Sequence, residues 1–106
     1  MLTYHLVPEE EFDESAEAYL PAAYTIDGFI HTTRPLALVA VVGNRYYRAD
    51  QRPYLLLTID LERVSAPWRY DAAGEEYPHI YGPIERRAVI DVRPAPREKD
   101  GTFLPL

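Results

Sequence analysis

The chain has 106 residues and a formal charge of −6, and it contains no cysteine. This length suits one domain, residues 1–106, with a core at about residues 2–94 and a tail at 95–106. The acidic balance argues against nucleic acid as a partner, because nucleic-acid binding requires a basic patch. The lack of cysteine excludes disulfides, thiolate nucleophiles and thiolate–metal clusters.

The N-terminal half predicts two strands and two helices. Residues 2–7 are rich in β-branched and aromatic side chains, which favour a strand. Pro8 suits the first turn of a helix, and the acidic residues after it favour the positive end of the helix dipole. The apolar residues of this helix recur at helical spacing, and Pro21 ends it; they are Phe12, Ala16, Tyr19 and Leu20.

A turn at residues 26–28 leads to a second expected strand at residues 29–32. Thr32 or Thr33 then suits the cap of a second helix, over residues 35–46, with Pro35 in its first turn. This helix is apolar on most sides, which predicts that it is buried or covered by a partner.

The C-terminal half predicts strands only. Residues 54–60 form a nearly continuous apolar run, which is typical of a central strand covered on both faces. Residues 68–71 alternate as in an edge strand, residues 77–84 are extended and sharply turned, and residues 88–93 are the last strand. The fold class is therefore α+β, with a twisted, mostly antiparallel sheet and two main helices near the N-terminus.

The three histidines of the chain lie in similar settings, and they are its clearest functional signal. His5, His31 and His79 are each flanked by aromatic or β-branched residues that predict strands. If these strands adjoin in one sheet, the three imidazoles line one pocket. The alternative for each is a histidine that only bonds backbone carbonyls at a strand end.

A metal site is a weaker interpretation of the same histidines. Zinc accepts three imidazoles and a water, but such ligands usually include a close pair, and these three are far apart in sequence. We therefore expect no metal. No serine lies in a nucleophile elbow, and no glycine-rich phosphate loop occurs.

Two blocks around these histidines carry further candidate groups. In the first, His31, Thr32 and Thr33 end a strand directly before a helix whose free N–H groups suit anions, although the threonines could merely cap that helix. In the second, prolines and Gly82 fix a turn that can aim His79 and Tyr81 into a cleft, or can form a rigid plug.

Four segments of the chain, taken in this order, resemble the small bacterial domain of unknown function 952 family. They are Tyr4-His5, Asp27-Gly28-Phe29-Ile30-His31-Thr32-Thr33, the strand that ends at Asp60, and Pro78-His79-Ile80-Tyr81-Gly82-Pro83. The resemblance extends to about Phe103. That family looks like a compact member of the ADP-ribosyltransferase-like fold.

The resemblance implies a pocket for NAD or a related nucleotide as a small-molecule ligand. The resemblance implies that the cofactor-binding residues are His5, which holds the ribose, together with Phe29, Thr32 and Thr33. It implies that the catalytic residues are His31, His79 and Tyr81. The transferases carry a glutamate in the third block, where this chain has His79, Tyr81 and, later, Glu85.

Three functions remain open at this point. The chain is a divergent enzyme acting on NAD or a related nucleotide, a non-catalytic small-ligand or partner-binding module, or a structural domain whose histidines only complete hydrogen bonds. No membrane-spanning run or leader peptide is visible in the sequence, so we expect a cytoplasmic protein without a membrane partner. The sequence names no protein partner.

Overall fold

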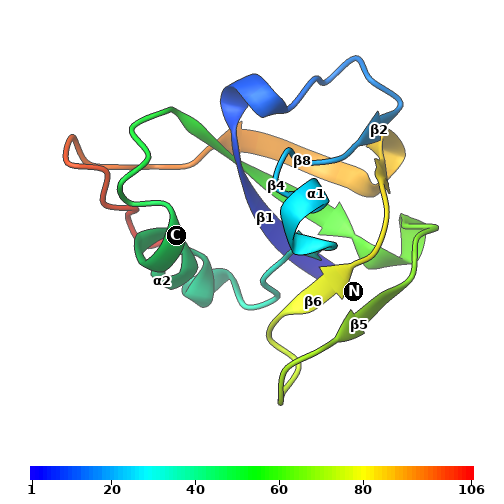
Figure 1. Ribbon diagram of the computed structural model, residues 1–106. Coiled ribbons are helices and arrows are strands. Elements are labelled where there is room, and N and C mark those ends of the chain that lie inside the picture. Colours follow the sequence, from blue (N-terminus) through cyan, green and yellow to red (C-terminus); the bar gives the residue numbers. More distant parts are fainter.

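A computed structural model describes residues 1–106. Three long strands form its first sheet, in the order β1 (Leu2–Pro8), β4 (Tyr54–Asp60), β8 (Val89–Pro94), and all are antiparallel (Figure 1). The central strand is the predicted apolar run, and Leu57 and Ile59 in it are fully buried. The expectation of a strand covered on both faces is confirmed.

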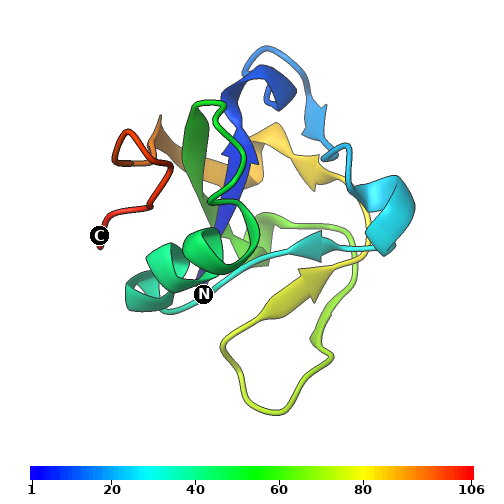
Figure 2. The same cartoon turned by 60° about the vertical axis from the view of Figure 1, so that its left-hand side comes forward.

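A second antiparallel sheet has the order β3 (Ile30–His31), β6 (Pro78–Ile80), β5 (Trp68–Tyr70). β5 lies at its edge, as the alternating sequence predicts. Tyr4 and Thr33 exchange two backbone hydrogen bonds of 2.8 Å, which join this sheet to β1. Figure 2 shows the segment after β3 passing beside β1 on its way to α2.

The remaining strands and the 3-10 helices are short and connect the strands of these two sheets along the sequence. β2 (Ala18–Tyr19) pairs antiparallel with β7 (Ile84–Glu85). Three single turns of 3-10 helix, η1 (Glu9–Glu11), η2 (Leu61–Arg63) and η3 (Arg86–Ala88), each adjoin an end of a long strand. The α+β class with antiparallel sheets is confirmed, and the ADP-ribosyltransferase-like relation stays a prediction.

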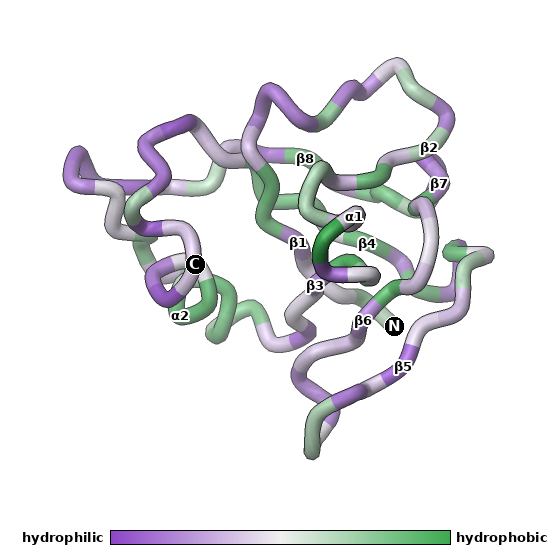
Figure 3. Tube along the Cα trace, viewed as in Figure 1, coloured by the Kyte–Doolittle hydropathy of each residue, from purple (hydrophilic) through white to green (hydrophobic).

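The core has two parts, one on each face of the first sheet. Successive side chains of a strand point to opposite faces, so Val7 enters one cluster and its neighbour Leu6 enters the other. Figure 3 shows the apolar stretches of β1 and β4 at the centre of the fold, with hydrophilic segments in the outer loops. The smaller cluster lies under α2 and contains Leu6, Val39, Ala40, Tyr54, Leu56 and Phe103.

The second predicted helix is confirmed as α2 (Leu36–Tyr46), but its surroundings differ from the prediction. It buries one face, and Leu36, Val41 and Tyr46 on the rest of its surface are exposed. No side chain caps its N-terminus, because the N-cap residue is Pro35, which has no side-chain hydrogen-bonding group; Thr32 and Thr33, the predicted caps, lie in the sheet before it. No helix of the structure has the length and apolarity needed to cross a membrane.

The first predicted helix, after Pro8, is wrong. The chain makes only the single turn η1, and the Asp13 carboxylate then accepts hydrogen bonds from the Ser15 amide and hydroxyl at 2.9 and 2.6 Å. This local bonding competes with helix formation. The first helix is instead α1 (Tyr24–Asp27), one turn that ends at Gly28 with a φ of 77°.

The tail at residues 95–106 was expected to lie outside the core, but it contributes one residue to it. Phe103 is 3% exposed and packs on α2. Asn44 fixes its backbone on both sides, since its amide donates to the Phe103 carbonyl at 3.0 Å and its oxygen accepts from the Phe103 N–H at 2.6 Å. The Arg97 guanidinium covers the Phe103 ring at 4.2 Å.

Candidate functional site

His5 is a buried histidine with both ring nitrogens engaged. Its Nδ1 lies 2.6 Å from the His31 carbonyl oxygen, and its Nε2 lies 2.7 Å from the Tyr19 hydroxyl. Burial lowers the pKa of His5 to about 4, so the ring is neutral at neutral pH. His5 therefore has no free donor for a ribose, although its ring lines the cavity described below.

His31 and His79 lie side by side because β3 and β6 place them directly opposite one another. Their ring centroids are 5.2 Å apart, and Phe29 stacks flat on His79 at 4.0 Å. Phe29 also contacts His31 edge-on at 4.7 Å. Directly opposite cross-strand residues share a face of a sheet, so these three rings form one aromatic cluster.

Asp71, just after β5, links His79 of this cluster to Arg69 and Tyr81. Its carboxylate accepts hydrogen bonds from the Tyr81 hydroxyl, from Arg69 Nε at 2.6 Å and from His79 Nδ1 at 2.8 Å. These bonds hold the pKa of Asp71 well below its usual range. The same bonds raise the pKa values of Tyr81 and Arg69.

The two predicted threonines are buried and make hydrogen bonds that join neighbouring strands. Thr32 Oγ1 donates to the Pro78 carbonyl at 2.6 Å and accepts from Thr3 Oγ1 at 2.8 Å. Thr33 makes the backbone bridge to Tyr4. Neither threonine lines the cavity that contains His5 and Phe29.

That cavity has a volume of about 240 Å³ and lies between β1, α1 and the loop before β4. Of the predicted site residues it contains His5, Phe29 and His31, while His79 and Tyr81 lie behind Phe29 and His31 on the outer side. Its remaining ionisable and aromatic lining is Glu11, Tyr19, Asp27, Tyr47, Asp50, Arg52 and Tyr54.

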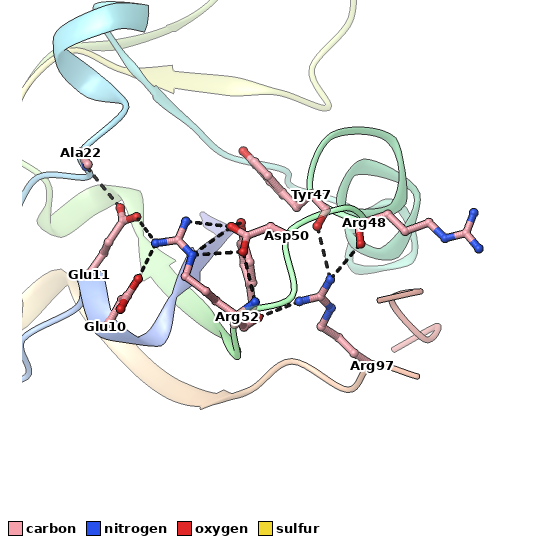
Figure 4. Close-up of polar contacts among 9 residues, drawn as sticks. Glu10, Glu11, Ala22, Tyr47, Arg48, Asp50, Arg52 and Arg97 are labelled. Carbon is pink, nitrogen blue, oxygen red and sulfur yellow. Dashed lines mark hydrogen bonds and ion pairs between the residues drawn. The ribbon is translucent and has the colours of Figure 1, made fainter. Parts of the chain in front are cut away.

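Arg52 is the one basic side chain of the cavity wall apart from the imidazoles, and it is fully engaged (Figure 4). Its guanidinium contacts Glu10 at 2.5 Å, Glu11 at 3.3 Å and Asp50 at 2.7 Å. Its hydrogen bonds lower the pKa of Asp50, and burial is the main reason that the pKa of Tyr54 is raised. Arg97 donates to the Arg52 carbonyl at 2.7 Å and so ties the tail to this wall.

His31 is the histidine of the cavity wall whose ring makes no hydrogen bond within the protein. Its Nε2 lies 3.6 Å from the Asp27 carboxylate, and its side chain is about half exposed. Burial and the nearby His79 lower the pKa of His31, while Asp27 opposes this shift. No group of three or more His, Asp or Glu side chains is placed to hold a metal ion.

Sequence reasoning missed Tyr19, Asp50 and Arg52 as cavity residues. Tyr19 was assigned to the buried stripe of a helix that does not form, and it reaches His5 only because β2 pairs with β7. Asp50 and Arg52 lie in the loop before β4, and nothing in their spacing points toward a site. The charge pattern of Glu10, Glu11 and Arg52 is readable only once η1 and that loop are adjacent.

Residues 6–92 match the family described as Protein of unknown function (DUF952). The chain belongs to the DUF952 family. The matched range contains the cavity wall from Leu6 onward and both histidine blocks after it, and the sequence resemblance to this family is confirmed.

Three solved structures of one protein share the DUF952 fold. CC0527 from Caulobacter crescentus is 21% identical, and its crystal structure matches with a TM-score of 0.78 over 98% of this chain and 94% of that chain. A double mutant of CC0527 gives the same values, and the solution NMR structure gives a TM-score of 0.69 over 94% and 89%. This likeness shows the fold alone. No curated protein matches the chain.

Proposed function

We propose that the cavity binds a small ligand with a positively charged planar ring, of the kind found at the oxidised nicotinamide end of NAD. The observation that carries this proposal is the lining itself. Six aromatic or imidazole rings line a space that is also bordered by Glu11, Asp27 and Asp50; the rings are His5, Tyr19, Phe29, His31, Tyr47 and Tyr54. Tyrosine faces and carboxylates both attract cations.

The size of the cavity limits what enters it. Drug-sized ligands occupy pockets of about 300–1,000 Å³. At about 240 Å³, this cavity accommodates a ring with one attached sugar and not a dinucleotide. The adenosine half of NAD would therefore lie outside, on the surface of the protein.

The charges of the cavity favour the cationic end of such a ligand over its phosphates. Three carboxylates line the wall, while the single guanidinium, Arg52, is already paired with Glu10, Glu11 and Asp50. A phosphate placed here meets no free cation and several negative charges. A pyridinium ring meets Asp27, whose carboxylate makes no hydrogen bond within the protein.

A catalytic version of the same proposal assigns the proton-transfer role to His31. Its ring lines the cavity, makes no hydrogen bond and has Asp27 beside it at 3.6 Å. His79 and Tyr81 are instead bonded to Asp71, so they support the Phe29–His31 wall from behind. Release of nicotinamide from NAD, present in the native protein and lost in His31→Asn, would establish this enzyme; no release would leave a binding module.

Titration calorimetry near neutral pH with three related probes tests the binding proposal. 1-Methylnicotinamide is a permanent cation, nicotinamide is neutral and nicotinate is an anion. We expect the cation to bind about tenfold more tightly than neutral nicotinamide, as one desolvated cation–π contact of about 1–2 kcal/mol requires. Nicotinate should not bind.

Asp27→Asn keeps the shape of the side chain and removes its charge. We expect this variant to lose most of the preference for the cation while it still binds neutral nicotinamide. Asp91→Asn is the matched control, because Asp91 lies on β8, is paired with Arg93 and does not line the cavity. Equal binding of nicotinate and the cation, or no binding of any probe, would overturn the proposal.

A further inference from the structure

The direction of two hydrogen bonds in the cavity wall follows from elementary chemistry. The His31 carbonyl can only accept, so the His5 Nδ1 that lies 2.6 Å from it carries the ring proton and donates. A neutral imidazole has a single ring proton, and burial keeps His5 neutral. The Nε2 atom of His5 is therefore an acceptor.

The Tyr19 hydroxyl must then donate to His5, since it lies 2.7 Å from that Nε2. Its one proton is used in this bond, and the hydroxyl makes no other hydrogen bond in the structure. What remains on the Tyr19 oxygen is an unused lone pair. A ligand group that approaches this oxygen must bring a hydrogen of its own.

The position of Tyr19 is fixed from three sides. Its backbone pairs with Ile84 of β7, and its ring packs edge-on against Phe12 at 5.5 Å. Its ring is also in contact with His5 at 5.5 Å. Glu11 lines the cavity nearby, and its negative charge adds to burial in raising the pKa of Tyr19, which keeps the hydroxyl protonated.

We infer that Tyr19 is a specificity-determining residue that admits ligands with a hydrogen-bond donor beside the ring, such as a carboxamide, and rejects those with only acceptors there. His5 is its positioning residue, because it fixes the direction in which the Tyr19 hydroxyl points its proton. This inference rests on the proposed function and names the side group of the ring that the cavity selects. A buried acceptor left unpaired by the wrong ligand is the physical basis of such discrimination.

Two cations of equal charge and nearly equal shape isolate this effect. 1-Methylnicotinamide carries an amide NH₂ where 3-acetyl-1-methylpyridinium carries a methyl group. For the native protein we expect the amide to bind about tenfold more tightly, as expected for one buried hydrogen bond with an unpaired partner. This comparison requires no variant, so a folding defect cannot obscure it.

The selectivity is the dissociation constant of the acetyl cation divided by that of the amide cation. Tyr19→Phe should bring this ratio close to one while the acetyl cation still binds. His5→Phe should release the Tyr19 hydroxyl to donate to the carbonyl that both cations carry, so the ratio should fall close to one while both cations still bind, whereas a damaged cavity would bind neither. Tyr46→Phe is the control, since it removes the hydroxyl of an exposed tyrosine on α2 that does not line the cavity and should leave the ratio unchanged.

The outcomes separate this inference from the proposed function. If the native protein binds neither cation, the proposed function itself fails. If it binds both cations equally well, the cavity takes charged rings but Tyr19 does not select among them, and the inference is overturned. An unchanged ratio in Tyr19→Phe would overturn it as well.

Discussion

Acidification from neutral pH to about pH 4 should lower the free energy of unfolding by about 3 kcal/mol through His5 alone. The pKa of His5 is about 4 in the folded protein, against an ordinary value of 6.5. The unfolded chain therefore binds the proton first, between pH 6.5 and about 4. Stability from this group is complete above pH 6.5 and is lost as the pH falls through this window.

Urea unfolding curves measured at several pH values across this window test the prediction, with His5→Gln as the variant. Glutamine does not titrate, so the variant should show a much flatter dependence, whatever its absolute stability. His31→Gln is the control; its parent side chain is half exposed and Asp27 opposes the shift, so it should remove a smaller part of the slope.

The carboxyl groups whose pKa values are lowered act at lower pH than the two histidines and do not obscure this window. The carboxyl pKa values of Asp50, Asp71 and Asp100 are lowered by their hydrogen-bond partners, so their contributions are lost mainly below about pH 4. Parallel slopes for the native protein and His5→Gln between pH 6.5 and 4.5 would contradict the burial of a neutral His5.

The three long strands of this fold are readable in the sequence because their patterns depend on side chains that the core buries. The apolar run at residues 54–60 predicts a central strand, and the structure has it at the same residues. The helix expected after Pro8 fails for a local reason, the turn closed by Asp13 and Ser15. Hydrophobic spacing alone does not register such side-chain bonding.

The candidate site was readable only in part, for a related reason. The sequence anticipated the approach of His31 to His79 only on the condition that their strands adjoin, and β3 and β6 do pair. The bonds of His5 to Tyr19 and of Asp71 to Tyr81 join residues whose elements have no pairing signal in the sequence. Prediction of the Arg52 cluster would have required the path of two loops.

The helix α2 and the C-terminal tail meet at one close contact, which provides the second large effect. A Cβ atom added at Gly43 would lie 2.8 Å from the Phe103 ring and 3.1 Å from Leu6. Gly43→Ala should therefore destabilise the protein by about 1–3 kcal/mol, although alanine favours the helix intrinsically. Phe103→Ala should cost about 3–5 kcal/mol, because it removes a buried ring from the smaller core cluster.

The double variant distinguishes this contact from general damage. Without the Phe103 ring, only the end of the Leu6 side chain lies close to a methyl group at position 43 and it can shift into the vacated space, so Gly43→Ala should become neutral or stabilising by up to about 1 kcal/mol. A double-mutant cycle measured by urea unfolding gives the coupling, with Ala37→Gly, on an exposed position of the same helix, as the control for helix propensity. Additive effects would mean that the tail does not press on α2. Strong coupling would mean that the tail is part of the folding unit, and that a chain cut after β8 loses both Phe103 and the hold of Arg97 on the Arg52 wall.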